Sequence, residues 1–397
     1  MSAETIAFGL AATAAVTSLV SISLSQVLLG VALVWILATR RKLEAPRVCW
    51  TLAFLAAWTL VSAALSAHPA AAMPQIRKFY VWLMLPVVYT AVRTQEHARR
   101  LFYSVAAAGT ASALWSLWQF ARKWNEAKAL GRPFNDYYDV DRITGFMSHW
   151  MTFGGGMMLV LTILSAAVLF DLKGRQRWLA IGAAAVVGLA IALGFTRSIW
   201  LASAVAGCVL LWMWKRWVVV AVPILLALGV MIAPEPLHTR IVSIWRPKAG
   251  DSNLHREALR ATGWAMIAAR PLVGFGPEQV QRNVPAYMPQ HYQPIPDNWW
   301  VGHLHNQFLH YAAERGLPAA LALAAFFIWM LRDLIRWRDG GFLRAASIAA
   351  IAGILAGGLF EVNLGDSEVL ALFLALLGAA AGSNRTPLKR SSQETAP

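Results

Sequence analysis

The chain is poor in charge and in cysteine. Only 14% of its 397 residues are charged, whereas 58% are apolar and the mean hydropathy is +0.52. A soluble domain carries about a quarter of its residues as Asp, Glu, Lys or Arg, so this composition excludes an ordinary soluble protein. The two cysteines, Cys49 and Cys208, lie inside or at the edge of apolar runs. This placement argues against a disulfide framework and favours buried, small apolar side chains.

Several local signatures are also missing. The sequence contains no Walker motif, no dinucleotide-binding fingerprint and no Gly-x-Ser-x-Gly elbow, so nucleotide-driven chemistry has no support. The N-terminus carries Glu4 and lacks the basic region of a signal peptide. We therefore expect the first apolar run to remain in the protein as a helix.

Apolar runs suited to membrane helices recur along the chain. A spanning helix needs roughly 20 apolar residues. The pattern predicts an all-α, polytopic membrane protein with about twelve transmembrane helices and one large loop on the outer side of the membrane. The runs lie at 5–20, 23–39, 48–66, 77–92, 100–121, 149–170, 177–195, 198–214, 217–234, 304–331, 342–360 and 367–382.

Lysine and arginine mark alternate connections between these runs. The first such connection carries Arg40-Arg41-Lys42, and the C-terminal tail carries Lys389-Arg390. Because short cytoplasmic connections are enriched in these residues, we expect both termini in the cytoplasm. The net charge of +15 is then a positive-inside bias and does not indicate nucleic-acid binding. The predicted division is transmembrane helices at 1–234, a large outer loop at 235–303, further transmembrane helices at 304–382 and a cytoplasmic tail at 383–397.

The large loop is too rich in proline, tryptophan and charge to cross a bilayer, and long ordered loops are often functional. Its pattern predicts one helix from Asn253 to Ala269, ended by Pro271 and the turn at 274–276. Trp299-Trp300 is the expected interfacial anchor. The residues predicted for the apolar side of the helix are Leu254, Leu259, Trp264 and Ile267.

The polar cluster that follows the loop is the strongest candidate for chemistry. His303, His305, Asn306 and His310 stand at the start of a long apolar run. A lone histidine at a membrane boundary commonly bonds to a backbone carbonyl, but a cluster favours a function in proton transfer. Zinc needs three or four ligands, and Glu314 lies too far along a helix to complete a local site. We therefore predict no metal.

Several cations are predicted at the outer boundary, where the positive-inside rule gives no reason for them. They can snorkel to lipid head groups or pair with Glu257, Glu361, Asp366 or Glu368. They can also bind a phosphate or diphosphate, and Arg197 is the strongest case because no carboxylate is adjacent to it in sequence. The other candidates are Arg256 and Arg260, one helical turn apart, and Arg77-Lys78.

An acidic run, Asp136-Tyr-Tyr-Asp139-Val-Asp141, precedes the sixth apolar run. Such a run is commonly a solvated turn, although its oxygen ligands could also hold a divalent cation.

The motifs around the loop resemble the O-antigen ligase and polymerase superfamily of bacterial envelopes. The resemblance is carried by Arg256, Trp264, Pro271-Leu272, Gly274-Phe275-Gly276, His305-Asn306-x-x-Leu309 and Glu314-x-Gly316, with Thr196-Arg197 ahead of the loop. It implies a GT-C-like architecture in the bacterial inner membrane with a periplasmic active site. It also implies glycosyl transfer from an undecaprenyl-diphosphate-linked glycan, to a sugar hydroxyl of the lipid A-core in the ligase, among membrane lipids.

The resemblance also implies roles for the candidate residues. His305 would be the catalytic base, with His303 the alternative, and Asn306 would orient a histidine or a sugar. On one continuous helix His303, Asn306 and His310 would share a face, which favours His303 as the base. If the helix begins only at Asn306, this argument does not apply, and the motif match favours His305. Neither a metal nor another cofactor is expected. Arg197 and Arg256, supported by Arg77, Lys78 and Arg260, would bind the diphosphate.

Other functions share many of these features. An O-antigen polymerase would use a second lipid-linked glycan as acceptor, and a protein oligosaccharyltransferase of the superfamily often carries a longer C-terminal soluble region. We expect the short C-terminal tail to favour the ligase. A transporter or lipid flippase is the alternative from a different class, although the halves of the chain show no clear internal repeat.

Overall fold

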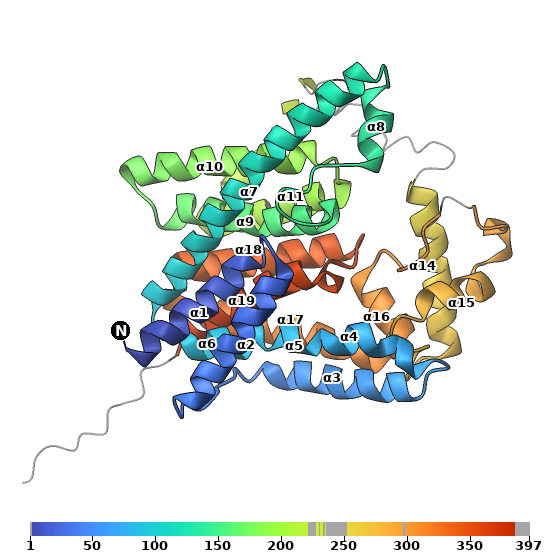
Figure 1. Cartoon of the computed structure of the whole chain (residues 1–397), viewed down its shortest axis with the longest axis horizontal. Helices are drawn as coiled ribbons and strands as arrows, with labels where there is room; N and C mark the ends of the chain where they lie inside the picture. Colours follow the sequence, from blue (N-terminus) through green and yellow to red (C-terminus); the bar gives the residue numbers. More distant parts are fainter. Residues whose placement is uncertain are drawn as a thin grey trace, which may run out of the picture.

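The chain is helical throughout its described parts. The computed structural model describes residues 2–220, 228–229, 231–232, 235, 252–296 and 299–385, with the side chains of 252 and 253 left out, and contains no strand among them (Figure 1). Three predicted features fall outside the described residues: most of the span at 217–234, most of the loop segment at 235–251, and the tail from 386 onward.

The described helices succeed one another in chain order. Their bounds are α1 (Ala3–Thr17), α2 (Ile22–Ala38), α3 (Cys49–Ala64), η1 (Pro69–Ala72), α4 (Met73–Arg77), α5 (Phe79–Trp82), α6 (Met84–Ala91), α7 (Gln95–Ala129), α8 (Phe134–Val140), α9 (Trp150–Phe170), α10 (Gly174–Leu193), α11 (Arg197–Lys215), η2 (Arg216–Val220), α14 (Ser252–Ala269), α15 (Val280–Tyr287), η3 (Gln290–Tyr292), α16 (Gln307–Arg315), α17 (Leu317–Arg336), η4 (Arg338–Gly340), α18 (Gly341–Gly358), η5 (Asn363–Gly365) and α19 (Ser367–Ser383).

Five helical segments in the described residues are long and apolar enough to cross a membrane: 150–170, 174–193, 197–220, 317–336 and 338–358. Four shorter apolar helices, α1, α2, α3 and α19, accompany them. The expectation of an all-helical, multi-pass membrane protein is therefore confirmed. The total of about twelve spans and the GT-C-like architecture stay predictions.

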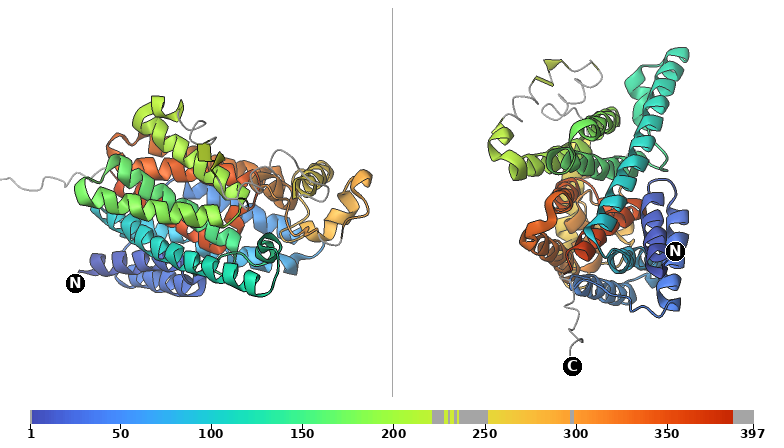
Figure 2. Two further views of the ribbon diagram at one scale, coloured as in Figure 1. Left: turned by 90° about the horizontal axis from the view of Figure 1, so that it is seen from above. Right: turned by 90° about the vertical axis from the view of Figure 1, so that its left-hand side faces the viewer.

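Most of the long helices lie roughly along one direction, α7 crosses them obliquely, and α14, α15 and α16 gather at one end of the bundle (Figures 1 and 2). The first turns of α1 lie toward the opposite end. Helix α19 is central, because every residue from Val369 to Ala380 is buried. A helix that is apolar all round is stable only when neighbours cover all its faces, and α6, α7, α9 and α18 contact this one.

Two predicted spans are interrupted. The run at 304–331 is not one helix, because Gly316 has a φ of +80° between α16 and α17. The run at 77–92 consists of α5, α6 and the last residue of α4. Backbone bonds three residues apart, from the Val81 N–H to the Lys78 carbonyl for example, tighten the helix there, and Pro86 lacks the N–H of a regular turn.

The loop helix ends at Ala269 as predicted, but only two of the four residues predicted for its apolar side are buried. Leu259 and Ile267 are buried, together with Ala258, Thr262 and Met266. Leu254 and Trp264, in contrast, are 42% and 61% exposed. Positions two residues apart lie roughly 200° around a helix, so Trp264 faces away from the side that Thr262 buries.

The acidic run at 136–141 belongs largely to α8, and two of its carboxylates form ion pairs. Asp139 lies 2.7 Å from the Arg142 guanidinium, and Asp141 pairs with the buried side chain of Lys123 on α7. The Lys123–Asp141 pair joins α7 to the end of α8, whereas the Asp139–Arg142 pair is local.

Candidate functional site

The loop after α14 docks onto the junction between α16 and α17 through backbone atoms. The Gly276 N–H donates to the Glu314 carbonyl at 2.7 Å, and the Leu317 N–H donates to the Pro271 carbonyl at 2.7 Å. A Cβ at Gly316 would lie 1.8 Å from the Leu272 carbonyl oxygen, and one at Gly274 would lie 2.4 Å from the Glu314 backbone. The glycines of the two motifs therefore allow the loop and the helix junction to touch, which places the histidine segment against the bundle.

The two candidate histidines stand in an irregular segment immediately before α16. Asn306 is the N-cap of this helix, and its Oδ1 accepts from the Leu309 N–H at 3.0 Å. Its Nδ2 donates to the Leu359 carbonyl at 3.3 Å, at the end of α18. Because the helix begins at Gln307, the shared-face argument for His303 does not apply. Asn306 starts the helix and fixes the histidine segment to α18.

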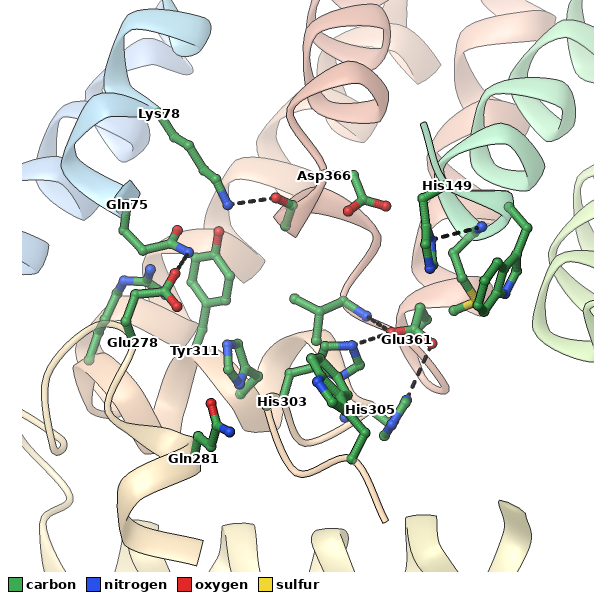
Figure 3. Close-up of a pocket in the computed structure, with 18 residues that line it drawn as sticks. Gln75, Lys78, His149, Glu278, Gln281, His303, His305, Tyr311, Glu361 and Asp366 are labelled. Atoms are coloured by element: carbon green, nitrogen blue, oxygen red, sulfur yellow. Dashed lines mark hydrogen bonds and ion pairs between the residues drawn. The ribbon is translucent and has the colours of Figure 1, made fainter. Parts of the chain in front are cut away.

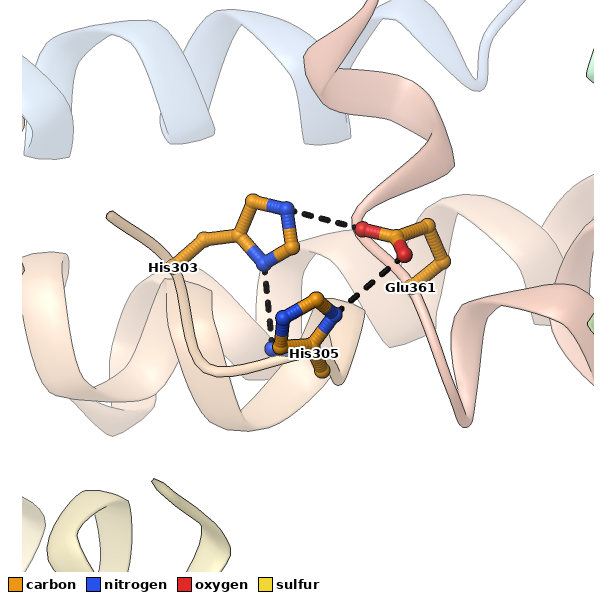
Figure 4. A group of neighbouring side chains, drawn as sticks. All are labelled: His303, His305 and Glu361. Carbon is orange, nitrogen blue, oxygen red and sulfur yellow. Dashed lines mark hydrogen bonds and ion pairs between the residues drawn. The ribbon is translucent and has the colours of Figure 1, made fainter. Parts of the chain in front are cut away.

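Glu361, from the connection between α18 and α19, joins both histidines (Figure 4). Its Oε1 lies 2.8 Å from His303 Nε2, and its Oε2 lies 3.3 Å from His305 Nδ1. The carboxylate is buried, with 5% of the residue exposed. Burial of a carboxylate is costly unless hydrogen bonds satisfy its oxygens, and the two imidazoles meet this requirement.

The hydrogen bonds distinguish the two rings. The His305 backbone N–H donates to His303 Nδ1 at 3.2 Å, so that nitrogen has no proton and Nε2–H of the same ring faces Glu361. Both nitrogens of His303 are thus engaged. His305 directs Nδ1 toward Glu361, and its Nε2 has no hydrogen-bond partner among the described residues. A neutral imidazole with Nδ1–H donating has its lone pair on Nε2, so His305 is the ring able to accept a proton.

The electrostatics favour the same protonation states. Burial lowers the pKa of His305; the hydrogen bond and charge of Glu361 oppose this shift, and the charges of His303 and Arg256 add to it. Burial alone would raise the pKa of Glu361, but the hydrogen bonds from His303 and His305 hold that pKa well below its usual range. At neutral pH the arrangement is a neutral His305 beside an ionised Glu361.

Two residues with left-handed backbone line the same cavity. His305 has a φ of +48° and Glu278 a φ of +62°. Non-glycine residues adopt this conformation uncommonly, and it concentrates where a precise side-chain direction matters. Here it turns the His305 ring toward Glu361 immediately before the helix begins.

The cavity has a volume of about 710 Å³ and lies where the ends of several helices meet (Figure 3). Lys78 reaches into it, and its Nζ donates to the Gly365 carbonyl at 2.6 Å. Asp366 accepts from the Thr152 hydroxyl at 3.0 Å, and burial raises the pKa of this carboxyl to about 6. Arg315 is 3% exposed and pairs with Glu314 at 3.0 Å. The lining thus combines a proton acceptor, two cations and carboxylates.

The structure brings some of the predicted residues together and leaves others apart. His303, His305 and Lys78 line the cavity. Arg256 lies near enough for its charge to act on His305. The remaining predicted cations do not line this cavity in the described structure: Arg77 and Arg260 are exposed, and Arg197 is half-buried at the start of α11.

Glu361, Asp366 and Arg315 are the lining residues whose roles sequence reasoning missed. The two carboxylates lie in the short connection between two apolar runs, which sequence analysis considered only as partners for arginines. Two carboxylates in a connection where only turn residues are expected are the sequence feature that could have indicated Glu361 and Asp366 as site residues. Arg315 stands inside the Glu314-x-Gly316 motif and carried no separate signal.

The His303, His305 and Glu361 cluster also has the composition of a metal site. One ligand atom from each residue lies within 4.8 Å of the others. The sequence argument against a metal considered only Glu314 as a third ligand. It did not include Glu361, which is distant from the histidines in sequence. Imidazole and carboxylate donors suit zinc, but the rings also satisfy the carboxylate directly. The absence of a metal stays a prediction.

A bundle of apolar helices with two histidines and a carboxylate in a polar cavity at one end defines a multi-pass membrane protein with a candidate site for proton transfer. Residues 182–324 match the family described as O-antigen ligase. This match confirms the resemblance to the O-antigen ligase superfamily, and it covers α14, α16 and both candidate histidines. The family implies a glycosyltransferase-type activity. No curated protein matches the chain.

Proposed function

We propose that the protein is an O-antigen ligase that moves a glycan from undecaprenyl diphosphate to a sugar hydroxyl of the lipid A-core. The reaction would take place at the periplasmic face of the bacterial inner membrane and would need no metal. The family match supports the class of reaction. The observation that carries the proposal is the contact of His305 Nδ1 with Glu361 in a residue that lines the cavity, because this contact leaves Nε2 as the ring nitrogen able to accept a proton.

The chemistry is a single displacement. His305 Nε2 accepts the proton of the acceptor hydroxyl, and the acceptor oxygen forms a bond to the anomeric carbon of the donor glycan. The bond between that carbon and the diphosphate oxygen breaks, and undecaprenyl diphosphate leaves with the electron pair. Attack from the face opposite the leaving group inverts the anomeric configuration. Proton removal by a positioned base contributes typically about 10²–10⁴-fold to such a rate.

Glu361 positions the base. It fixes the Nδ1–H tautomer of His305 and stabilises the imidazolium that forms when the proton arrives, as a buried carboxylate does beside other catalytic histidines. His303 holds the second carboxylate oxygen at 2.8 Å. It therefore acts on the base through Glu361 and through the His305 backbone N–H.

The leaving diphosphate needs cations close to the cavity. Lys78 is the best placed, because its Nζ borders the cavity and forms no ion pair with a described carboxylate. Arg315 also borders the cavity, although Glu314 offsets its charge. We propose that Lys78 and Arg256 contact the diphosphate, with Arg197 as a further candidate from α11, while the exposed Arg77 and Arg260 contribute at most to long-range attraction.

The test is transfer in a reconstituted system. Purified protein is mixed with an undecaprenyl-diphosphate glycan and rough lipopolysaccharide, with EDTA present, and His305→Ala is assayed alongside. We expect glycan on the lipopolysaccharide in EDTA and none in the variant. Lengthening of the lipid-linked glycan instead would identify a polymerase, and the absence of both products would favour the transporter alternative.

A further inference from the structure

A second cavity lies at the end of the bundle opposite the histidine cavity. It has a volume of about 530 Å³ and is bordered by the segment before α3, the last turns of α17 and the end of α19. Helix α17 begins beside the histidine cavity and ends here, so the two sites are separated by the length of that helix, roughly 30 Å. Four arginines line the cavity, with Asp333 as the one acid of the described lining: Arg47, Arg332, Arg336 and Arg385.

Most of this positive charge is not neutralised by protein groups. Arg385 pairs with Glu44, which Arg93 also contacts at 3.1 Å. Within the described part of the chain, the other three arginines of the lining form no ion pair. Guanidinium groups bind phosphate through paired N–H donors. The cavity is thus suited to a phosphate-bearing group.

An apolar groove lies next to the arginine cavity. It has a volume of about 450 Å³, lies between α3 and α17, and is lined almost wholly by apolar side chains, including Trp50, Phe54 and Leu321. Trp50 is 74% exposed and Leu321 is 67% exposed. Arg47 of the arginine cavity stands one helical turn before Trp50, so the two sites adjoin at the start of α3.

The sequence of α17 joins the same two sites. Leu321, Ala325, Trp329, Arg332 and Arg336 recur at intervals of three or four residues, so they lie along one side of the helix. The first two border the groove and the last three border the arginine cavity. Along this stripe the surface changes from apolar residues, through a tryptophan typical of the membrane interface, to cations.

We propose that this composite site binds an anionic glycerophospholipid, with its phosphate in the arginine cavity and an acyl chain along the groove. The groove faces outward and is apolar, as a lipid chain requires, and basic pockets between membrane helices suit anionic head groups. The site shares no residue with the histidine cavity. The proposal is therefore independent of the glycosyl transfer proposed above.

The first experiment measures lipid binding to the full-length, detergent-purified protein by native mass spectrometry. It compares phosphatidylglycerol with phosphatidylcholine of the same acyl chains. We expect the wild-type protein to prefer phosphatidylglycerol, and Arg332→Gln/Arg336→Gln to weaken its binding roughly 30-fold, from the usual contribution of each cation at a membrane surface.

The matched control is Arg175→Gln/Arg177→Gln, which removes the same charge from exposed residues at the start of α10. We expect this control to bind phosphatidylglycerol as the wild type does. Equal losses in the two double variants, or unchanged binding in Arg332→Gln/Arg336→Gln, would overturn the proposal.

A further comparison distinguishes a lipid from a free anion. Ala325→Phe places a ring in the groove without touching an arginine, and inorganic phosphate offers the head-group chemistry without a chain. We expect the variant to weaken phosphatidylglycerol binding by at least tenfold, and millimolar phosphate to leave that binding nearly unchanged. Full displacement by phosphate, or full binding by the variant, would show an anion site and contradict the lipid assignment.

Discussion

His305 Nδ1 lies 3.3 Å from Glu361 Oε2, although 56 residues separate the two in sequence. This contact joins the segment before α16 to the connection between α18 and α19. It leaves Nε2, the opposite ring nitrogen, as the proton acceptor and places a buried carboxylate next to the base. The proposed reaction depends on this relationship, because it decides which nitrogen accepts the proton.

The pH dependence of Glu361→Gln tests the positioning role. The transfer rate should rise with pH as His305 loses its proton, and burial already places that pKa below its ordinary value. Glu361 opposes the lowering, so its removal lowers the His305 pKa further. We expect a slower enzyme whose acid limb lies at lower pH than that of the wild type, measured as transfer rate between pH 4 and pH 8.

A purely structural role for Glu361 predicts a different profile. The variant would then lose activity at every pH, with the acid limb in its original position. Glu361→Asp is the matched variant, since it keeps the charge and shortens the side chain. It should restore the position of the acid limb more fully than the rate.

Lys78 and Arg77 offer an adjacent pair with different exposure. Lys78 borders the cavity, whereas Arg77 is exposed and outside the lining. We expect Lys78→Gln to reduce transfer at least tenfold, because an electrostatic contact to a developing charge is lost. Arg77→Gln should stay within about threefold of the wild type. Similar losses in both variants would mean that net charge, rather than a contact from Lys78, assists the reaction.

The docking of the loop on α16 and α17 predicts a strong effect at Gly316. Its φ of +80° and the 1.8 Å approach of a Cβ to the Leu272 carbonyl leave no room for a side chain. Gly316→Ala should cost at least about 2 kcal/mol, seen as a lower apparent Tm by tryptophan fluorescence. Gly182→Ala, where a Cβ meets nothing within 4 Å, should leave the Tm within a few degrees.

The sequence predicted the membrane class, the loop helix and the histidine pair because each depends on composition or on neighbouring residues. The role of Glu361 could not be predicted from composition or neighbouring residues, because it arises from the packing of α18 and α19 against the segment before α16. The same limit explains Trp264, which helical periodicity alone did not place on the exposed side of α14. It also explains Gly316, whose break between α16 and α17 follows from a close contact with a distant loop.

The most direct test compares His305→Ala with His303→Ala in the reconstituted transfer assay under single-turnover conditions. His305 supplies the accepting nitrogen, so its loss should slow transfer by about 10²–10⁴-fold. His303 acts through Glu361 and the backbone, and its loss should cost about tenfold or less. The account is contradicted if the His303 variant is the slower of the two, or if His305→Ala transfers glycan at the wild-type rate.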